Sequence, residues 1–116
     1  MLLTINLEPV PLARPRVTNR GTFLPKRSQK FRDDFQTLAR AAFHRQPFNC
    51  ELSVSLHFFK NINPVAQAYG DIDNLVKAVL DAGNGFIWTD DKLITELHAF
   101  KHKGAGKIIL EVVEIE

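Results

Sequence analysis

The 116-residue sequence contains few of the residues that mark several protein classes. It has one cysteine, Cys50, so it can form neither an intramolecular disulfide nor a cysteine-based zinc site. Its longest uninterrupted apolar stretches are three residues, far short of the ~18 that a membrane-spanning helix needs. No basic region precedes the first apolar run, unlike in a signal peptide. These absences predict a soluble protein in a reducing compartment, the cytoplasm, with no membrane segment.

The composition predicts one folded domain. Hydrophobic residues make up 45% of the chain and the formal net charge is only +2, which excludes an intrinsically disordered chain. A chain of this length buries about two thirds of its unfolded surface, enough for one hydrophobic core but not two. We therefore expect a single domain over residues 1–116.

Acidic residues are missing from one long segment, since none lies between Glu8 and Asp33. That segment holds seven of the fifteen basic residues: Arg14, Arg16, Arg20, Lys26, Arg27, Lys30 and Arg32. A second basic group, Lys101, Lys103 and Lys107, surrounds a Gly-Ala-Gly sequence. Basic side chains bind nucleic acid by releasing counterions from its phosphates. Both groups are predicted to contact DNA, with ordinary solvated basic loops as the alternative.

The hydrophobic periodicity predicts an α+β fold. Alternating apolar residues predict strands at 2–8 and 51–58, and helical spacing predicts helices at 28–46, with Ser28 as N-cap, and at 72–84. Strands at about 93–101 and 107–115 would form a hairpin around residues 103–106. This order predicts a single-domain, two-layer sandwich in which two helices cover one face of a mixed sheet.

Carboxylates are concentrated in the middle of the chain. Asp71 and Asp73 are two residues apart, so in extended backbone both would point to one side while Ile72 points into the core. Lys77 and Asp81 follow at steps of one helical turn, and Asp90 and Asp91 come shortly after Trp88. Carboxylates held close together repel one another unless a cation neutralises them. Because the donors are all oxygens, Mg²⁺ or Mn²⁺ is favoured over Zn²⁺.

Taken one at a time, these residues also fit structural roles. Asp73 could be an N-cap, the series Asp73, Lys77 and Asp81 a surface ion-pair ladder, and Asp90 with Asp91 a turn. A bare Asp-x-Asp pair occurs in many loops. The specific signal is therefore the combination of both motifs with a basic segment on each side.

The sequences DIDNLVKAVLD (71–81) and WTDD (88–91) resemble, in order, spacing and position, those of the RusA family of Holliday junction resolvases. The resemblance implies a RusA-like fold and a Mg²⁺-dependent homodimeric endonuclease, encoded by bacteria or their prophages, that cuts four-way junction DNA in recombination and repair. Mn²⁺ would substitute for Mg²⁺, and no small-molecule cofactor is implied. By motif position, it implies that Asp71, Asp73 and Asp91 are the catalytic metal-binding carboxylates and Lys77 the essential lysine. Asp90 is a further candidate ligand.

The chain departs from the family just before Asp71. A run of arginines is expected there, whereas residues 66–70 read Ala-Gln-Ala-Tyr-Gly. Tyr69 could stack on an unpaired base at the junction centre, or it could be a half-buried loop residue. Two other functions stay open: a metal-dependent nuclease for flaps or other branched DNA, and a non-catalytic DNA-binding module.

A homodimer follows from symmetry if the chain resolves junctions. Two incisions related by a two-fold axis need two carboxylate clusters, and one chain supplies one. Phenylalanines could line the interface or equally belong to the core: Phe43, Phe48, Phe59 and Phe100.

Overall fold

The computed structural model describes residues 1–12, 16–18, 21–62 and 70–116. Arg14, Arg20 and Tyr69 lie outside the described residues. Its helices and strands, in chain order, are β1 (Leu2–Ile5), β2 (Arg16–Thr18), β3 (Gly21–Phe23), α1 (Lys26–Arg40), β4 (Leu52–Lys60), α3 (Ile72–Gly83), the single 3-10 turn η1 (Asp91–Leu93), β5 (Ile94–Lys103) and β6 (Lys107–Glu114).

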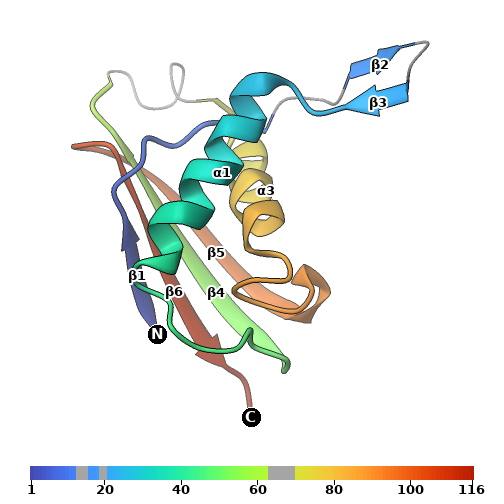
Figure 1. Ribbon diagram of the computed structural model, residues 1–116. Coiled ribbons are helices and arrows are strands. Elements are labelled where there is room, and N and C mark those ends of the chain that lie inside the picture. The colour runs from blue at the N-terminus through green and yellow to red at the C-terminus, as the bar shows by residue number, and fades with distance from the viewer. Residues whose placement is uncertain (13–15, 19–20, 63–69) are drawn as a thin grey trace.

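The main sheet has four strands in the order β1-β6-β4-β5. Strand β4 pairs with β5 in parallel and with β6 antiparallel, and β6 also pairs antiparallel with β1, so the sheet is mixed. Helices α1 and α3 lie side by side on one face of this sheet (Figure 1). The predicted two-layer α+β fold is confirmed.

Strand β4 supplies the centre of the hydrophobic core. Its side chains at Leu52, Val54, Leu56 and Phe58 are all fully buried, alternating with more exposed neighbours as the sequence pattern predicts. They belong to one core cluster with apolar side chains of both helices, among them Phe35, Leu75 and Val79. Each large apolar side chain buried there stabilises the fold by about 1.5–3 kcal/mol.

Helix α1 differs from its predicted bounds at both ends. It begins at Lys26 after Pro25, and Ser28 is a buried residue of the first turn instead of the N-cap. It ends at Arg40, well before residue 46, because the chain then turns so that Phe43 reaches the core. The Phe43 ring packs on that of Phe86 at 5.7 Å between centroids. Tertiary packing therefore ends this helix before Pro47.

The predicted hairpin of β5 and β6 is wrong. Each of these strands pairs with β4, which lies between them, so the Gly104–Gly106 connection crosses the end of β4. The amide of Gly104 donates to the Lys60 carbonyl at 3.1 Å during this crossing. A Cβ at Gly106 would lie 2.6 Å from Cγ of Glu8, so a side chain there would collide with its neighbour. Glycine at residue 106 therefore allows the connection to pass close to Glu8.

The opposite sheet face carries aromatic rings that the helices do not cover. His57 stacks on Phe100 at 4.7 Å and His102 stacks on Phe59 at 4.7 Å, and Phe100 is 45% exposed. Of the four phenylalanines considered for an interface, the other two, Phe43 and Phe48, are buried in the core.

The first strands of the chain also differ from the sequence prediction. Strand β1 ends at Ile5 instead of residue 8, and the ribbon of β2 and β3, which projects beside the start of α1 in Figure 1, was not predicted. Among the described residues, no helix is both long and apolar enough to cross a membrane.

Candidate active site

The first motif begins where the chain turns into α3. Gly70 has a φ of +85°, a conformation that glycine adopts without strain, and it packs against Pro11. Asp71 is the N-cap residue of α3, in extended backbone, and Asp73 is already helical. The prediction of one extended segment with both carboxylates on one side is therefore wrong. Ile72 is 39% exposed, so it also does not point into the core.

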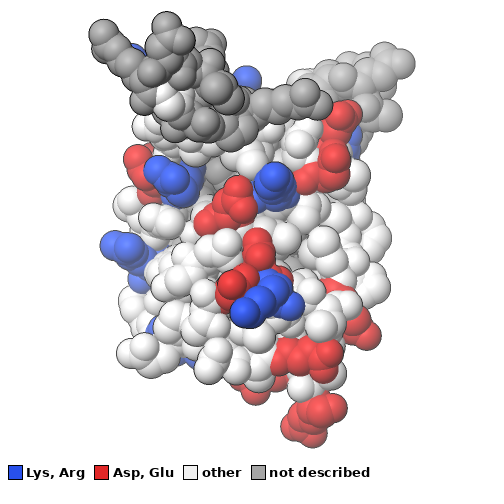
Figure 2. All heavy atoms as spheres, turned by 90° about the vertical axis from the view of Figure 1, so that its right-hand side faces the viewer, with Lys and Arg blue, Asp and Glu red and all other residues white. Residues whose placement is uncertain are grey.

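A cavity of about 370 Å³ lies between α3, η1 and β5 and collects most of the predicted polar residues. Four charged side chains line it: Asp73, Lys77, Asp81 and Asp91. Its remaining lining is apolar: Ile72, Val76, Leu80, Leu97 and Ala99. Figure 2 looks onto the side of the molecule where β5 forms the sheet edge, and shows acidic side chains gathered in mid-face with basic ones among them. Asp71 does not line this cavity, because it sits at the helix N-cap.

Asp91 is held in place by Asn84, a site residue that was not predicted. Oδ1 of Asn84 accepts from the Asp91 amide at 2.9 Å, and its Nδ2 donates to the Asp91 carboxylate at 3.4 Å. The same Oδ1 also accepts from Nε1 of Trp88 at 3.1 Å. The available signal was Asn84 on the polar side of the helical pattern, but its partner lies seven residues away in a turn.

Trp88 of the second motif has a structural role. Its side chain is fully buried, and a Cβ at Gly83 would lie 2.7 Å from its ring. The turn is tied to the chain before β4, because Phe48 donates its amide to Ile87 and accepts from that of Thr89 at 2.8 and 3.0 Å. Trp88 therefore fixes the turn that presents Asp91 to the cavity.

Asp90 points its carboxylate at the backbone of its own turn. Its Oδ1 accepts from the Lys92 amide at 3.0 Å and caps η1. The predicted turn role of this residue is confirmed, and its place as a metal ligand stays a prediction.

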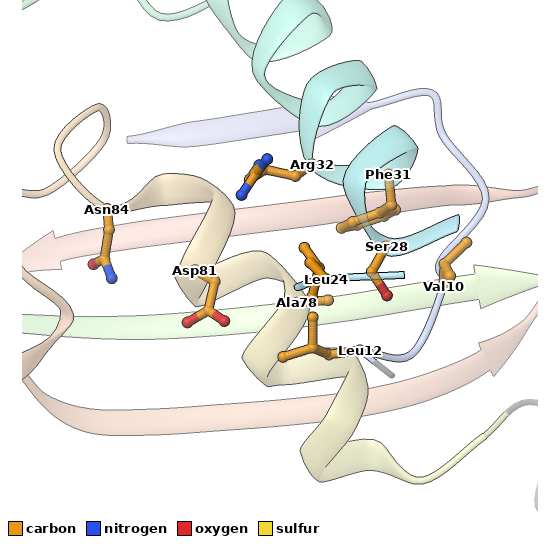
Figure 3. A pocket seen from close by; sticks show the side chains of 9 residues that line it. All are labelled: Val10, Leu12, Leu24, Ser28, Phe31, Arg32, Ala78, Asp81 and Asn84. Carbon is orange, nitrogen blue, oxygen red and sulfur yellow. The ribbon is translucent and has the colours of Figure 1, made fainter. Parts of the chain in front are cut away.

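Asp81 stands between two cavities on adjacent sides of α3. It lines the cavity described above and a second one of about 290 Å³ between α1 and α3 (Figure 3). Burial raises the pKa of Asp81, the charge of Asp91 raises it further, and Lys77 and Arg32 act in the opposite direction.

The donor set suits a hydrated Mg²⁺ better than a closed metal site. Among the described residues, no three Asp, Glu, His or Cys side chains converge closely enough to enclose a metal. Mg²⁺ does not need such a cage, because it usually keeps several waters and binds one or two carboxylates together with substrate phosphates. Asp73 and Asp91, both facing one cavity, supply oxygen donors of this kind.

The sequence model of the family described as Endodeoxyribonuclease RusA matches residues 6–113. The chain belongs to this RusA family. No curated protein matches the chain. Since the match covers both motifs, the Asp73, Lys77 and Asp91 cavity is the candidate active site of a RusA endodeoxyribonuclease.

The basic residues predicted to bind DNA lie on more than one side of this RusA domain. Lys26 and Arg27 are exposed in the first turn of α1, and Lys30, further along it, pairs with Asp34 at 2.8 Å, which raises the pKa of Lys30. Arg16 belongs to β2, and Lys101 and Lys103 to the end of β5. Lys107 lies over the Phe59 ring at 4.9 Å, on the uncovered sheet face. Lys107 therefore lies on the opposite side of the sheet from α3.

Proposed function

We propose that this protein is a Mg²⁺-dependent endonuclease that resolves four-way DNA junctions by paired symmetric nicks in recombination and repair. Mn²⁺ would replace Mg²⁺. The observation that carries the proposal is the shared cavity of Asp73, Lys77 and Asp91 in a chain of the RusA family.

Asp73 and Asp91 would hold the metal, and Asp71, which lies outside the cavity at the N-cap of α3, and Asp90 are further candidates. When bound, Mg²⁺ lowers the pKa of a coordinated water and neutralises charge on the phosphate oxygens. The protein contributes the position of these carboxylates, and Asn84 fixes Asp91 through both its backbone and its side chain.

Lys77 would act through its charge. Its side chain is exposed on α3 and shares the cavity with the carboxylates. A fixed ammonium beside the scissile phosphate would stabilise the negative charge that builds up on the phosphorus oxygens during attack by water. This role needs no proton transfer by Lys77, and cleavage would leave a 5′ phosphate.

The active form would be a C2 homodimer. One chain brings one carboxylate cavity, whereas paired nicks need two cavities related by a two-fold axis. The stacked rings of the uncovered sheet face, Phe59 and Phe100 among them, are candidates for burial in this dimer.

The test is a strand-labelled mobile four-way junction incubated with Mg²⁺, beside a flap and a linear duplex of the same sequence. We expect paired, symmetric nicks in the junction and little cutting of the duplex. Asp73→Asn should abolish cleavage while junction binding persists or tightens, because repulsion of the phosphate is reduced. Asp33→Asn is the matched control, since Asp33 is an exposed acid on α1 whose side chain is 70% accessible.

Each contrary result has a defined meaning. Preferred cleavage of the flap would replace junction resolution with a broader activity on branched DNA. Binding without cleavage, with no effect of Mg²⁺ on the wild type or on Asp71→Asn in calorimetry, would show a DNA-binding module. Full cleavage by Asp73→Asn would overturn the assignment of the active site.

A further inference from the structure

The second cavity, between α1 and α3, holds none of the proposed metal ligands, although Asn84, which positions Asp91, is part of its lining. Its apolar walls come from three parts of the chain: Val10, Leu12, Leu24, Phe31 and Ala78. The rest of its lining is polar and comes from α1 and from the C-terminal end of α3: Ser28, Arg32, Asp81 and Asn84 (Figure 3). At about 290 Å³ it is near the lower limit of ligand pockets in proteins, ~300 Å³. It therefore suits one ring system better than a larger molecule.

Two hydrogen bonds hold walls of the cavity in place. The amide of Leu12 donates to the Asn74 carbonyl at 3.0 Å, which holds the N-terminal wall against α3. Nε2 of Gln36 donates to the Ala82 carbonyl at 3.1 Å, which ties α1 to α3. Ala78 contributes only a methyl group between these walls, and this leaves the space open.

The two charged side chains limit what can occupy the cavity. A phosphate would meet the Asp81 carboxylate, and a metal ion would meet the Arg32 guanidinium with a single carboxylate to hold it. No ion pair among the described residues joins Arg32 to Asp81; the recorded pair of Arg32 is with Asp33, at 3.9 Å. A flat, neutral group that offers both donors and acceptors would satisfy both side chains and fill the apolar space. A nucleobase is such a group.

The position of Asp81 connects this cavity with the active site. Lys77 lines the active-site cavity, Ala78 lines the second one, and Asp81 lines both. Residues 77 and 78 are separated by ~100° around the helix, so the two cavities open on adjacent sides of α3. A nucleotide whose phosphate lies by Lys77 could therefore place its own or a neighbouring base in the second cavity.

We propose that the α1–α3 cavity receives one unstacked nucleobase next to the scissile phosphate and so selects branched DNA over duplex. This inference rests on the proposed nuclease function. A base inside a continuous duplex must leave its stack and its partner before it can enter, and this costs a few kcal/mol, least for a base that is already unpaired. Branch points supply unpaired bases. The cavity therefore gives a physical reason for structure selectivity that needs no sequence readout.

The experiment is a double-mutant cycle between base and cavity, measured by junction affinity without a divalent metal. A junction series carries one abasic residue at successive positions around the cut. Wild type should lose about 5- to 150-fold in affinity at one position, the range for the loss of one base contact. Ala78→Leu, which fills the cavity, should bind the intact junction with a similar loss, yet bind the abasic junction as wild type does.

Two further variants protect the test against misfolding. Leu24→Phe fills the cavity from its other wall if Ala78→Leu does not fold, and Leu38→Phe is its matched control, because Leu38 is an exposed residue of α1 outside the cavity. Arg32→Gln should change the preference among the four bases at the sensitive position and leave the other positions unaltered.

Additive losses at every position would overturn the proposal, because the cavity would then take no base. That result is distinguishable from failure of the proposed function. The cycle measures binding alone, so it can fail while paired Mg²⁺-dependent nicks still appear, and it can succeed in a protein that does not cut.

Discussion

Asn84 and Asp91 are joined by two hydrogen bonds that hold both the backbone and the carboxylate of the aspartate. The same amide oxygen accepts from buried Trp88, so one side chain links the end of α3, the core and the candidate active site. Asn84 is therefore a candidate positioning residue, which would act on the proposed reaction through Asp91.

Two substitutions of Asn84 separate its role as hydrogen-bond acceptor for Trp88 from its role in positioning Asp91. Asn84→Ala leaves Nε1 of Trp88 without its acceptor and frees Asp91, so we expect a loss of about 1–3 kcal/mol in unfolding free energy together with reduced cleavage. Asn84→Asp keeps the acceptor but places a second charge beside Asp91. It should unfold close to wild type and still cleave at least tenfold more slowly at saturating junction, with little change in affinity. Denaturant unfolding and single-turnover kinetics measure the two effects. Wild-type cleavage by Asn84→Asp would remove the positioning role.

The contact between Gly83 and Trp88 predicts that the effect of Gly83→Ala on stability depends on the side chain at residue 88. Alanine at residue 83 would be favoured by helix propensity over glycine by about 1 kcal/mol if space allowed. Its Cβ would lie 2.7 Å from the Trp88 ring, so we expect Gly83→Ala to destabilise the protein by about 1–3 kcal/mol instead. In a Trp88→Leu background the same change should cost much less or stabilise. Equal costs in both backgrounds, measured by urea unfolding, would show that the ring is not the cause.

The environment of Asp81 predicts that Asp81→Asn stabilises the folded protein in a pH-dependent way. Burial raises the pKa of Asp81 in the folded protein above that of the unfolded chain, so the folded state binds the proton more tightly. The associated stability is present at low pH and is lost as pH rises through the raised pKa. Asparagine cannot ionise, and Asp81→Asn should therefore unfold at higher urea than wild type at pH 7, with the difference shrinking near pH 3. A gain that is constant from pH 3 to 7 would contradict the assignment to Asp81 ionisation.

The two sides of the sheet predict different salt dependences of DNA binding. Lys26 and Arg27 are exposed at the start of α1, on the helical face, and Lys107 lies on the uncovered sheet face. If DNA lies along the helical face, the double change Lys26→Gln with Arg27→Gln should lower the slope of log affinity against log salt by about 2. Lys107→Gln should leave that slope unchanged. The reverse pattern, measured by fluorescence anisotropy of a labelled junction, would place the DNA on the uncovered sheet face.

Patterns that depend on neighbours along the chain were predicted from the sequence. The alternation in β4 and the two faces of α3 were both correct, because burial of one side directly produces a period of two or of one helical turn. Lys77 and Asp81 on that helix were placed correctly for the same reason.

What was missed depends on contacts between distant segments. Phe43 ends α1 early by packing against Phe86, and nothing near residue 40 in the sequence marks that contact. The role of Asn84 depends on its hydrogen bond with Asp91 in the following turn, and the sequence pattern of the helix does not reveal that contact. Asp71 is separated from the cavity because α3 begins at Ile72, one residue after it. The two-residue spacing of Asp71 and Asp73 does not by itself show where the helix begins.

The crossing of Gly104–Gly106 over the end of β4 has a consequence for the order of folding. Because β5 and β6 pair with β4 and not with each other, residues 94–114 cannot form an autonomous hairpin that nucleates the sheet. Strand β4 must be in place first, and all of its pairings in this sheet are with strands at least 30 residues later in the chain. Such distant pairings close long loops and are slow. The turn that carries Asp91 immediately precedes β5, so this aspartate would be ordered late, and a newly made chain would gain its phosphodiester-cutting capacity only after the sheet is complete.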